Sequence, residues 1–358
     1  MNRVGILTFH RANNIGAVLQ ASAICHFLRL DNIDAELIDY VPNNACTIPQ
    51  NTISGLLHEL KCKLYYIKNS GEKVRDCRFS EYRKKYYTIS TKTYYGDSGI
   101  ANANFDYDAI ISGSDQILNT TLTGNSKAYY LDFFNGKKIS YASSFGRKDL
   151  SKEEIELIRN ELPKFAALSV REQSGADIIK KEIGIEPQLV LDPVFLLRKD
   201  EWSKRCNEQL KLPKKYIFVY SMEISPVLEN AVSTIKEETG LPVIIVRGGG
   251  KPGLIEGNED STCGPEEFLR YIRDAELVIT NSFHGTAFSL IFEKKLLCVA
   301  HSTRNARLEN IMSIIGKEDS LLKCESSVPV IVNGKEASST IKPYIYASKE
   351  YLKNALYK

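Results

Sequence analysis

Short apolar runs alternate with segments of helical periodicity along the chain, and this alternation restricts the possible folds more than any other feature. In the first half, runs such as Arg3–Phe9 and Tyr107–Ser112 flank segments such as Ala17–Leu30, whose apolar residues recur every three or four positions. The second half contains a similar series of short apolar runs, which includes Tyr216–Tyr220 and Leu277–Thr280. Short buried strands that alternate with helices indicate parallel sheets covered on both faces. The sequence therefore predicts an α/β protein.

A chain of 358 residues is long enough for two domains of ordinary size, each with its own core. Because the alternation occurs twice, we predict two Rossmann-like lobes with a cleft between them, over residues 1–198 and 199–340. A Lys- and Tyr-rich insertion is expected at about residues 45–105 of the first lobe, and a final helix at residues 341–358. Ligands of open α/β sheets bind beyond the carboxyl ends of strands, so the loops that follow strands should carry the site.

Composition excludes several classes of protein. The chain is 43% hydrophobic and 25% charged, as in soluble globular proteins, and no apolar run approaches the roughly 18 residues of a membrane span. The first residues, MNRVGILTFH, show neither the apolar core nor the cleavage site of a signal peptide. The eight cysteines form no CxxC or zinc-ligand pair, so we expect reduced thiols, no metal site and a cytoplasmic location.

Positive charge is concentrated between Lys61 and Tyr95, although the net charge of the chain is only +3. This stretch holds ten Lys or Arg residues against three acids, together with seven of the nineteen tyrosines. It can contact an anionic membrane surface or a lipid-linked substrate, or it can be a solvated pair of helices whose tyrosines pack inward, which is the commoner case. We expect no nucleic-acid partner, because the rest of the chain is near neutral and no known binding module is present.

The stretch LVITNSFHGTAFSLIF, residues 277–292, is the most informative joint between a predicted strand and a predicted helix. A helix N-terminus presents unpaired backbone N–H groups and a partial positive charge, so it binds anions. Gly285 lets the backbone approach a ligand, and His284 adds a proton or a hydrogen-bond donor. We predict a site for a small anion such as a phosphate ester, beside Asn281, Ser282 and Thr286. The competing interpretation is a turn in which the histidine only caps the helix.

Two joints in the first half carry polar side chains directly after a predicted strand. After the first strand, Asn14 and Gly16 form a tight turn into a helix, without the G-x-G-x-x-G fingerprint of a dinucleotide site. After the third strand, Asp115 is followed by Gln116. A carboxylate at this place can act as a general base, accept a hydrogen bond from a sugar hydroxyl or cap the next turn. Both joints are therefore candidates for contact with a substrate.

Two further joints present cations. Arg171 follows the strand predicted at 167–170 and can clamp a carboxylate or phosphate through two hydrogen bonds, or it can pair with Glu172. The stretch RGGGKPG, residues 247–253, follows a strand of the second half and includes Lys251. It lacks the spacing of a phosphate-binding P-loop, so we interpret it as a mobile loop that can close over an anion.

Several motifs in this order resemble the polysaccharide pyruvyl transferase family: TFHRANNIGAVLQ, GSDQILN, ISYASSFG, SVREQSG, LVLDPVFLL, VITNSFHGTAFSLIF and the N-x-R of residues 305–307. The matches run from about residue 3 to 316, and their order makes the signal specific. The resemblance implies a GT-B-like fold with the acceptor in the first lobe, phosphoenolpyruvate (PEP) in the second and the last helix packed back on the first lobe. It also implies transfer of a pyruvyl group from PEP to two hydroxyls of one sugar, which forms a cyclic ketal on a surface polysaccharide precursor.

The resemblance further implies partners and residue roles. PEP is the donor substrate, no cofactor or metal is needed, and a lipid-linked acceptor would bring the protein to the inner face of the membrane. The family's His-Gly motif falls on His284 and Gly285, its strand-end arginine on Arg171 and its acidic residue on Asp115. His284 would donate the proton or stabilise the leaving phosphate, Arg171 would hold PEP, and Asp115 would take a hydroxyl proton from the acceptor.

One position departs from the family pattern. Many members carry arginine two residues before the histidine, whereas this chain has Ser282, followed by Phe283. The cation expected at the donor would then come from elsewhere in the chain, and the candidates are Arg307, Arg304 and Lys251.

Three other functions stay open at this point. A nucleotide-sugar glycosyltransferase of the same architecture would need acidic residues for a ribose, and Glu266 and Glu267 are the adjacent candidates. A non-catalytic saccharide-binding member of the family would explain Ser282. A transferase that uses PEP or a phosphosugar and acts on a soluble metabolite would gain nothing from a lipid anchor on the acceptor.

Overall fold

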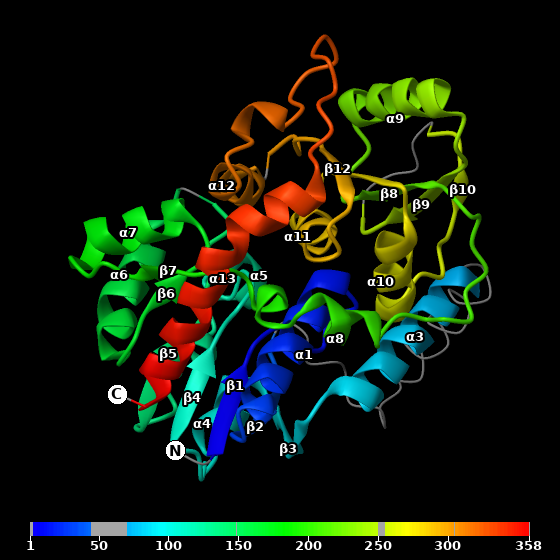
Figure 1. The fold of residues 1–358 in the computed structure, drawn as a ribbon. Coiled ribbons are helices and arrows are strands. Elements are labelled where there is room, and N and C mark those ends of the chain that lie inside the picture. The colour runs from blue at the N-terminus through cyan, green and yellow to red at the C-terminus, as the bar shows by residue number, and fades with distance from the viewer. Residues whose placement is uncertain (1–2, 44–69, 148, 250–254, 304, 358) are drawn as a thin grey trace, which may run out of the picture.

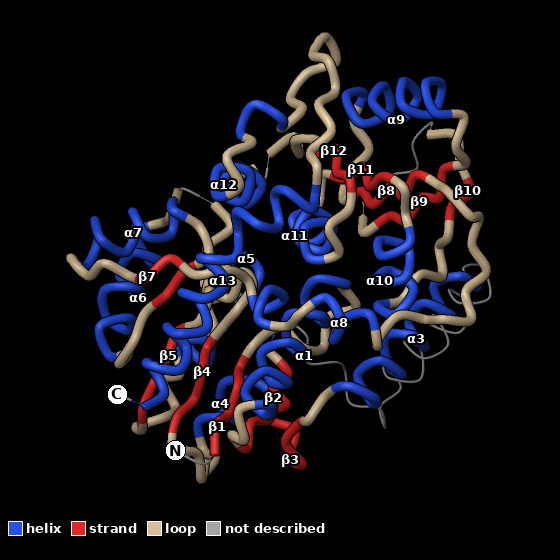
Figure 2. Tube along the Cα trace, in the orientation of Figure 1, coloured by secondary structure: helices blue, strands red, loops and turns tan. Residues whose placement is uncertain are grey.

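The computed structural model describes residues 3–43, 70–147, 149–249, 255–303 and 305–357 (Figure 1). Two candidate cations, Lys251 and Arg304, and much of the predicted insertion lie outside the described residues. The chain forms two α/β lobes, each built around a parallel sheet with helices packed against it (Figure 2). The predicted fold class is thus confirmed.

The first lobe contains a five-stranded parallel sheet in the order β3-β2-β1-β4-β5. In register, Leu7 of β1 lies opposite Ser112 of β4, which lies opposite Ser140 of β5, so the loops after these strands meet at one edge. The strands are β1 (Arg3–Leu7), β2 (Asp34–Val41), β3 (Ile89–Tyr95), β4 (Ala109–Ser112) and β5 (Lys137–Ser140). The helices are α1 (Ile15–Leu30), α3 (Ser70–Tyr86), α4 (Gly96–Ala101), α5 (Thr120–Thr123), α6 (Lys152–Glu161) and α7 (Gln173–Ile183), and a separate pair of strands is formed by β6 (Ser169–Val170) and β7 (Gln188–Leu189).

The second lobe repeats this plan with the strand order β10-β9-β8-β11-β12. Thr280 at the end of β11 lies opposite Tyr220 of β8 and Cys298 of β12. The strands are β8 (Ile217–Ser221), β9 (Val243–Arg247), β10 (Asn258–Glu259), β11 (Leu277–Thr280) and β12 (Lys295–Cys298). The helices are α8 (Lys199–Ser203), α9 (Pro226–Thr239), α10 (Pro265–Asp274), α11 (Phe283–Ile291), α12 (Ala306–Ile314) and α13 (Gly334–Tyr357). Along the whole chain, short 3₁₀ turns span Lys127–Tyr130, Leu162–Lys164, Pro193–Leu196 and Glu318–Ser320.

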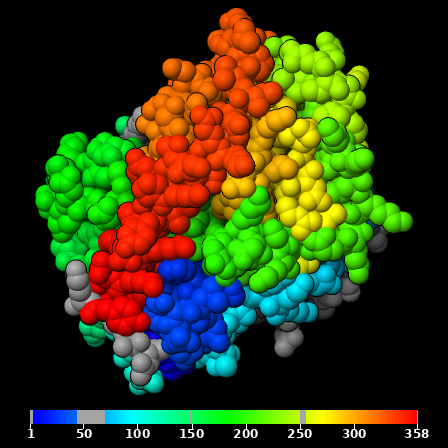
Figure 3. All heavy atoms as spheres, viewed as in Figure 1, coloured from blue at the N-terminus to red at the C-terminus, as the bar shows by residue number. Residues whose placement is uncertain are grey.

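The final helix, α13, joins the two lobes. It begins at Gly334, earlier than the predicted start at residue 341, and contacts α11 and β12 of the second lobe. Its later part reaches the first lobe, where Tyr351 donates a hydrogen bond to the carbonyl of Ser140 at 2.9 Å and Ser348 accepts one from the amide of Leu191 at 2.8 Å. In the space-filling view it runs across the surface of both lobes (Figure 3).

The predicted insertion is partly wrong, because some of it belongs to the framework of the protein. β3 is the edge strand of the first sheet, and its exposed position allows the polar sequence ISTKTYY that disguised it. α3 reaches the second lobe, where Arg78 donates to the carbonyl of Thr262 at 2.9 Å. Phe79 and Tyr82 are buried on α3, so aromatic residues of this basic helix do pack inward.

One buried hydrophobic cluster spans the two lobes, and three further clusters lie elsewhere in the described chain. Val18 and Leu19 of α1 belong to the same buried cluster as Trp202, Phe218 and Phe288 of the second half. The core thereby holds α1 against α11, and the N-termini of these helices lie at the sheet edges that face each other (Figure 1). Among the helices described here, none is both long and apolar enough to span a membrane.

Candidate active site

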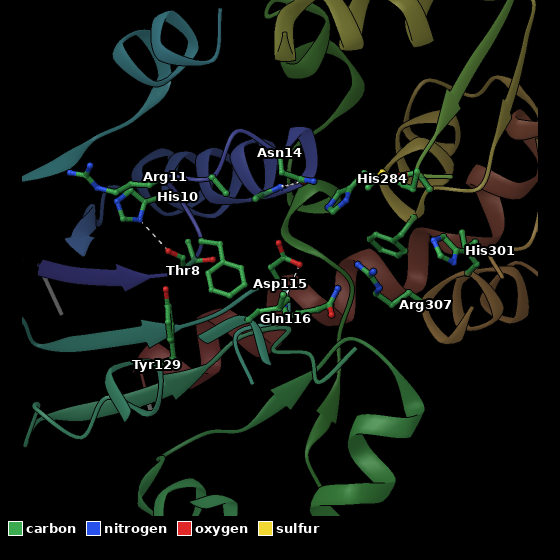
Figure 4. Close-up of a pocket in the computed structure, with 18 of the residues that line it drawn as sticks. Thr8, His10, Arg11, Asn14, Asp115, Gln116, Tyr129, His284, His301 and Arg307 are labelled. Atoms are coloured by element: carbon green, nitrogen blue, oxygen red, sulfur yellow. Dashed lines mark hydrogen bonds between the residues drawn. The ribbon is translucent and has the colours of Figure 1, made fainter. Parts of the chain in front are cut away.

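A cavity of about 580 Å³ lies where the carboxyl ends of the two sheets meet (Figure 4). Its wall is formed by the loops that follow β1, β4, β8 and β11 and by the first turn of α12. Of the predicted site residues, Asn14, Asp115, Gln116, Asn281, Ser282, His284 and Arg307 line it. The structure thus brings together strand-end residues from both lobes.

Each small residue at the joint between β11 and α11 has a role in capping or packing this part of the fold. Ser282 is the N-cap, and its hydroxyl accepts a hydrogen bond from the amide of Gly285 at 3.4 Å. A Cβ atom on Gly285 would stand 2.4 Å from Oγ1 of Thr280, so this glycine lets the helix pack on the strand rather than admitting a ligand. The hydroxyl of Thr286 lies 3.5 Å from Sγ of Cys298, toward the sheet. Neither Gly285 nor Thr286 lines the cavity.

Asn281 also has a local role, since its amide group joins the two strand ends. It accepts a hydrogen bond from the amide of Met222 and donates one to the carbonyl of Glu223, both at 2.8 Å. His284 in the first turn of α11 is different: its side chain is 9% exposed, it lines the cavity, and Nε2 has no hydrogen-bond partner in the structure. A buried imidazole nitrogen without a partner is a candidate for contact with a ligand.

Gly16 brings the first turn of α1 against the imidazole of His284. A Cβ atom at position 16 would stand 2.1 Å from Nδ1 of His284, so only glycine leaves room for the ring. Asn14 caps α1 by accepting a hydrogen bond from the amide of Ala17 at 3.1 Å. The close-up shows Asn14 beside His284 (Figure 4). Two helix N-termini, one from each lobe, therefore approach the same place.

Arg171 lies behind the cavity in a buried network of carboxylates. Its guanidinium is 2.6 Å from Asp192 and 3.0 Å from Asp115, and Nε is 3.7 Å from Glu172. Burial disfavours the charge of Arg171, but these three carboxylates outweigh burial and raise its pKa. Its side chain is 1% exposed and does not line the cavity. The sequence predicted a clamp on the substrate or a pair with Glu172; the structure gives Arg171 three acidic partners at once.

Two carboxylates of this network have lowered pKa values. Burial opposes ionisation of Asp192, yet the neighbouring His284 and Arg171 lower its pKa to about 2. For Asp115, the charges of Arg171, Arg307 and His284 likewise outweigh burial and lower the pKa. Asp192 Oδ2 lies 3.7 Å from Nε2 of His284, close enough for electrostatic attraction but too far for a hydrogen bond.

Arg307, in the first turn of α12, differs from Arg171 in having no ion pair with a described carboxylate. No hydrogen bond or ion pair joins its guanidinium to any other residue that the structure describes. Burial lowers the pKa of Arg307 to about 10, and repulsion from Arg171 adds to the shift. Its Cζ lies 5.9 Å from the centre of the Phe283 ring. In the close-up it points toward Asp115 and Gln116 (Figure 4).

The first-lobe end of the cavity holds a further polar cluster that the sequence analysis missed. The carboxylate of Asp39 accepts a hydrogen bond from Nε2 of His10 at 3.0 Å and two from the guanidinium of Arg11 at 2.7 and 2.6 Å. Burial opposes ionisation of Asp39, but the hydrogen bonds from His10, Arg11 and Thr93 outweigh it and lower its pKa. Asp192 was also missed; its signal was present, because it follows β7 within LVLDP just as Asp115 follows β4.

Other sequence candidates are occupied or absent from the cavity. Glu266 pairs with Lys85 at 2.9 Å, and Glu267 accepts hydrogen bonds from the amide of Gly264 at 3.1 Å and from Asn207 at 2.8 Å. These carboxylates serve α10 and do not line the cavity. Within the described ranges, no group of three or more His, Cys, Asp or Glu side chains could hold a metal ion.

Comparisons with solved structures identify the fold. A proposed UDP-N-acetylglucosamine 2-epimerase from Listeria monocytogenes aligns over 99% of this chain and 90% of its own, with 10% identity and a TM-score of 0.50. The UDP-GlcNAc 2-epimerase of Methanocaldococcus jannaschii aligns over 97% of this chain and 100% of its own, with 16% identity and a TM-score of 0.47. A UDP-glucosyltransferase from Polygonum tinctorium aligns over 99% of this chain and 94% of its own, with 11% identity and a TM-score of 0.39. At such identities the likeness concerns the fold alone, which is GT-B-like.

Comparisons of sequence identify the family. No curated protein sequence matches the chain. A sequence model of polysaccharide pyruvyl transferases, however, matches residues 14–303. This range includes Asn14, Asp115, Arg171, Asp192 and His284, and stops just before Arg307. The chain therefore belongs to the polysaccharide pyruvyl transferase family.

Proposed function

We propose that this protein transfers a pyruvyl group from PEP to two hydroxyls of one sugar and so forms a cyclic ketal in surface polysaccharide biosynthesis. The observation that carries the proposal is Arg307, a guanidinium at the cavity wall that forms no ion pair or hydrogen bond with a described carboxylate, although Asp115, Glu172 and Asp192 attract it from a distance. A charge taken out of water requires a counter-charge, and an anionic substrate would supply it. The proposal includes PEP as donor substrate, no resident cofactor, and a sugar or lipid-linked oligosaccharide as acceptor on the cytoplasmic side.

The donor end of the cavity suits the charges of PEP, which carries a phosphate and a carboxylate. Arg307 offers a planar fork of donors that matches either group. The first turns of α11 and α1 add partial positive charge, and His284 lies between them. We place PEP against Arg307 and His284 on the second-lobe side, which leaves the part of the cavity beside Asp115 and Gln116 for the acceptor.

The reaction begins with a proton transfer. His284 donates a proton to the methylene carbon of PEP, which makes the adjacent carbon electrophilic. A sugar hydroxyl adds to that carbon and gives up its proton to Asp115. Phosphate then leaves with its bonding electrons and takes up the proton held by Asp115, and the second hydroxyl adds to the same carbon, gives its proton to the imidazole of His284 and closes the ring. Asp115 can serve here although its pKa is low, because a hydroxyl that attacks a cationic carbon becomes strongly acidic.

Two residues position the reacting groups in this scheme. Asp192 lies 3.7 Å from Nε2 of His284 and helps to orient the imidazole. Arg171 fixes Asp115 and Asp192 through ion pairs of 3.0 and 2.6 Å. We therefore assign Arg171 to the support of the acid and the base, and the contact with PEP to Arg307.

A ligand panel tests the proposal. Thermal unfolding and calorimetry with PEP, UDP, GDP and inorganic phosphate are measured on the wild type, His284→Ala and Arg307→Met. A ligand that binds only the folded state stabilises it by about 2.7 kcal/mol at a hundred times its dissociation constant, which is readily seen. PEP should stabilise the wild type more than the nucleotides do, and both variants should lose most of the shift. Stabilisation by a nucleotide but not by PEP would instead support a glycosyltransferase.

A further inference from the structure

One aromatic ring lies close to His284 and to two guanidinium groups, those of Arg171 and Arg307. The centre of the Phe283 ring lies 5.4 Å from Cζ of Arg171 and 5.9 Å from Cζ of Arg307. The imidazole of His284 meets it edge to face, with 5.1 Å between ring centres and an interplanar angle of 83°. We propose that Phe283 is a positioning residue that holds Arg307 in the cavity as the donor-binding cation. This inference rests on the proposed function, because it takes PEP as the anion that Arg307 binds.

Arg307 has few other means of staying in place. No described residue forms an ion pair or hydrogen bond with its guanidinium, and a long side chain loses rotamer freedom when it is fixed. The neighbouring Arg171 repels it. The face of an aromatic ring is negative and attracts cations within about 6 Å of its centre. The charges of Asp115, Glu172 and Asp192 also attract Arg307, but none of them forms an ion pair or hydrogen bond with it, and the ring of Phe283 adds a short-range attraction that holds it near a second guanidinium.

The surroundings of Phe283 differ from those of a purely structural phenylalanine on the same helix. Phe288 is fully buried, and its ring neighbours are Trp202 at 4.9 Å and Phe268 at 5.8 Å. Phe283 is only partly buried and lines the cavity. A residue selected for packing alone would be expected in the first setting. The second setting suits a ring that holds charged groups beside a ligand.

The carboxylates explain why the ring acts on Arg307 rather than on Arg171. Asp115, Asp192 and Glu172 already fix Arg171, so its position does not depend on Phe283. Arg307 lacks such partners in the described chain and therefore depends on the ring. Removal of the ring should loosen Arg307 alone, and the loss should be seen in the affinity for the donor.

A double-mutant cycle with calorimetry tests this inference, with PEP and inorganic phosphate as probes. Phe283→Leu keeps an apolar side chain but removes the ring, and we expect PEP and phosphate to bind about three- to thirtyfold more weakly. Phe283→Tyr keeps the ring and should bind both as the wild type does. In an Arg307→Ala background, Phe283→Leu should cause no further loss. Phe292→Leu, at the buried end of α11, is the control for a lost ring and should leave affinity unchanged.

The outcomes separate the inference from the proposed function. If Phe283→Leu binds both anions normally, or weakens them equally with and without Arg307, the positioning role is wrong while PEP binding stands. If the wild type binds phosphate but not PEP, the proposed function is wrong, and the phosphate cycle still decides whether Phe283 acts through Arg307. If the wild type binds neither anion, both are wrong.

Discussion

Arg171 and Arg307 contact the same phenylalanine ring from different lobes, yet their electrostatic surroundings are opposite. Arg171 follows β6 of the first lobe and is enclosed by three carboxylates, whereas Arg307 begins α12 of the second lobe and has no described acidic partner. The pKa of Arg171 is raised and that of Arg307 is lowered to about 10. Carboxylates of the protein thus neutralise the charge of Arg171 through ion pairs without any ligand, whereas Arg307 forms no such ion pair with a described residue. Under the proposed function, the anionic donor binds at Arg307.

The largest effect is expected from a substitution of His284, at the cavity where the ligand would bind. His284→Ala should lower the rate of phosphate release from PEP, measured with a panel of sugar acceptors, by about a hundred- to ten-thousandfold, because it removes the general acid. Unfolding curves should show that the variant remains folded. Turnover close to that of the wild type in a folded His284→Ala protein would refute the proposed role of the imidazole.

The two arginines themselves give the most direct test of the comparison. Arg171→Met leaves three buried carboxylates without their counter-ion and should lower the free energy of unfolding by about 3–5 kcal/mol. Arg307→Met removes a charge that forms no ion pair in the described chain and is repelled by Arg171, so it should change stability much less than Arg171→Met does, while weakening the binding of PEP. Urea unfolding of both variants measures the difference. Equal losses of stability would show that Arg307 is as well paired as Arg171.

The sequence predicted the regular part of the fold because each buried element carries its own apolar pattern. The strand at Leu277–Thr280 has the bounds that were predicted. It missed β3, since an edge strand keeps polar residues on its exposed side, and it placed the start of α13 too late, because Gly334 and Pro343 interrupt the helical pattern. Residues at edges and ends are selected by neighbours that the local sequence does not reveal.

The site shows the same division between local and distant causes. His284, Asp115 and Asn14 were recognised because each follows a strand, and the carboxyl ends of parallel strands meet at one edge. The sequence could not rank Arg171 against Arg307, since the partners that engage Arg171 lie 56 and 21 residues away, at Asp115 and Asp192. Only the assembled structure shows which guanidinium is already neutralised.

Gly16 tests whether the first lobe fixes the histidine of the second. In Gly16→Ala the new methyl group would stand 2.1 Å from Nδ1 of His284, so we expect a loss of about 1–3 kcal/mol in the free energy of unfolding and weaker PEP binding. The same substitution in a His284→Ala background should cost much less, because the ring that it strikes is gone. An equal cost in both backgrounds would place the strain elsewhere on α1.

The pH dependence of stability probes the complete network around Arg171. The pKa of Asp192 is about 2 in the folded protein, against about 4 for an unfolded aspartate, so the unfolded state takes up protons first as the pH falls. The stabilisation of about 2 kcal/mol is fully present above pH 5 and is lost as the pH falls from about 4 toward 2. Denaturant unfolding between pH 7 and 3 should show this decline, and a smaller one in Asp192→Asn. If the free energy of unfolding of Asp192→Asn fell with pH as steeply as that of the wild type, the assignment to Asp192 would be contradicted.

The smallest expected effect concerns a salt bridge between the lobes at the surface. Lys85 and Glu266 lie 2.9 Å apart, but the lysine side chain is 62% exposed, so solvent screens the pair. Glu266→Gln should change the free energy of unfolding by less than about 1 kcal/mol and leave PEP and UDP binding unaltered. A loss of UDP affinity in this variant would revive the glycosyltransferase interpretation. The contrast with Arg171 follows from burial: two pairs of similar length differ in energy because only one is removed from water, and only the buried pair is expected to determine the geometry of the site.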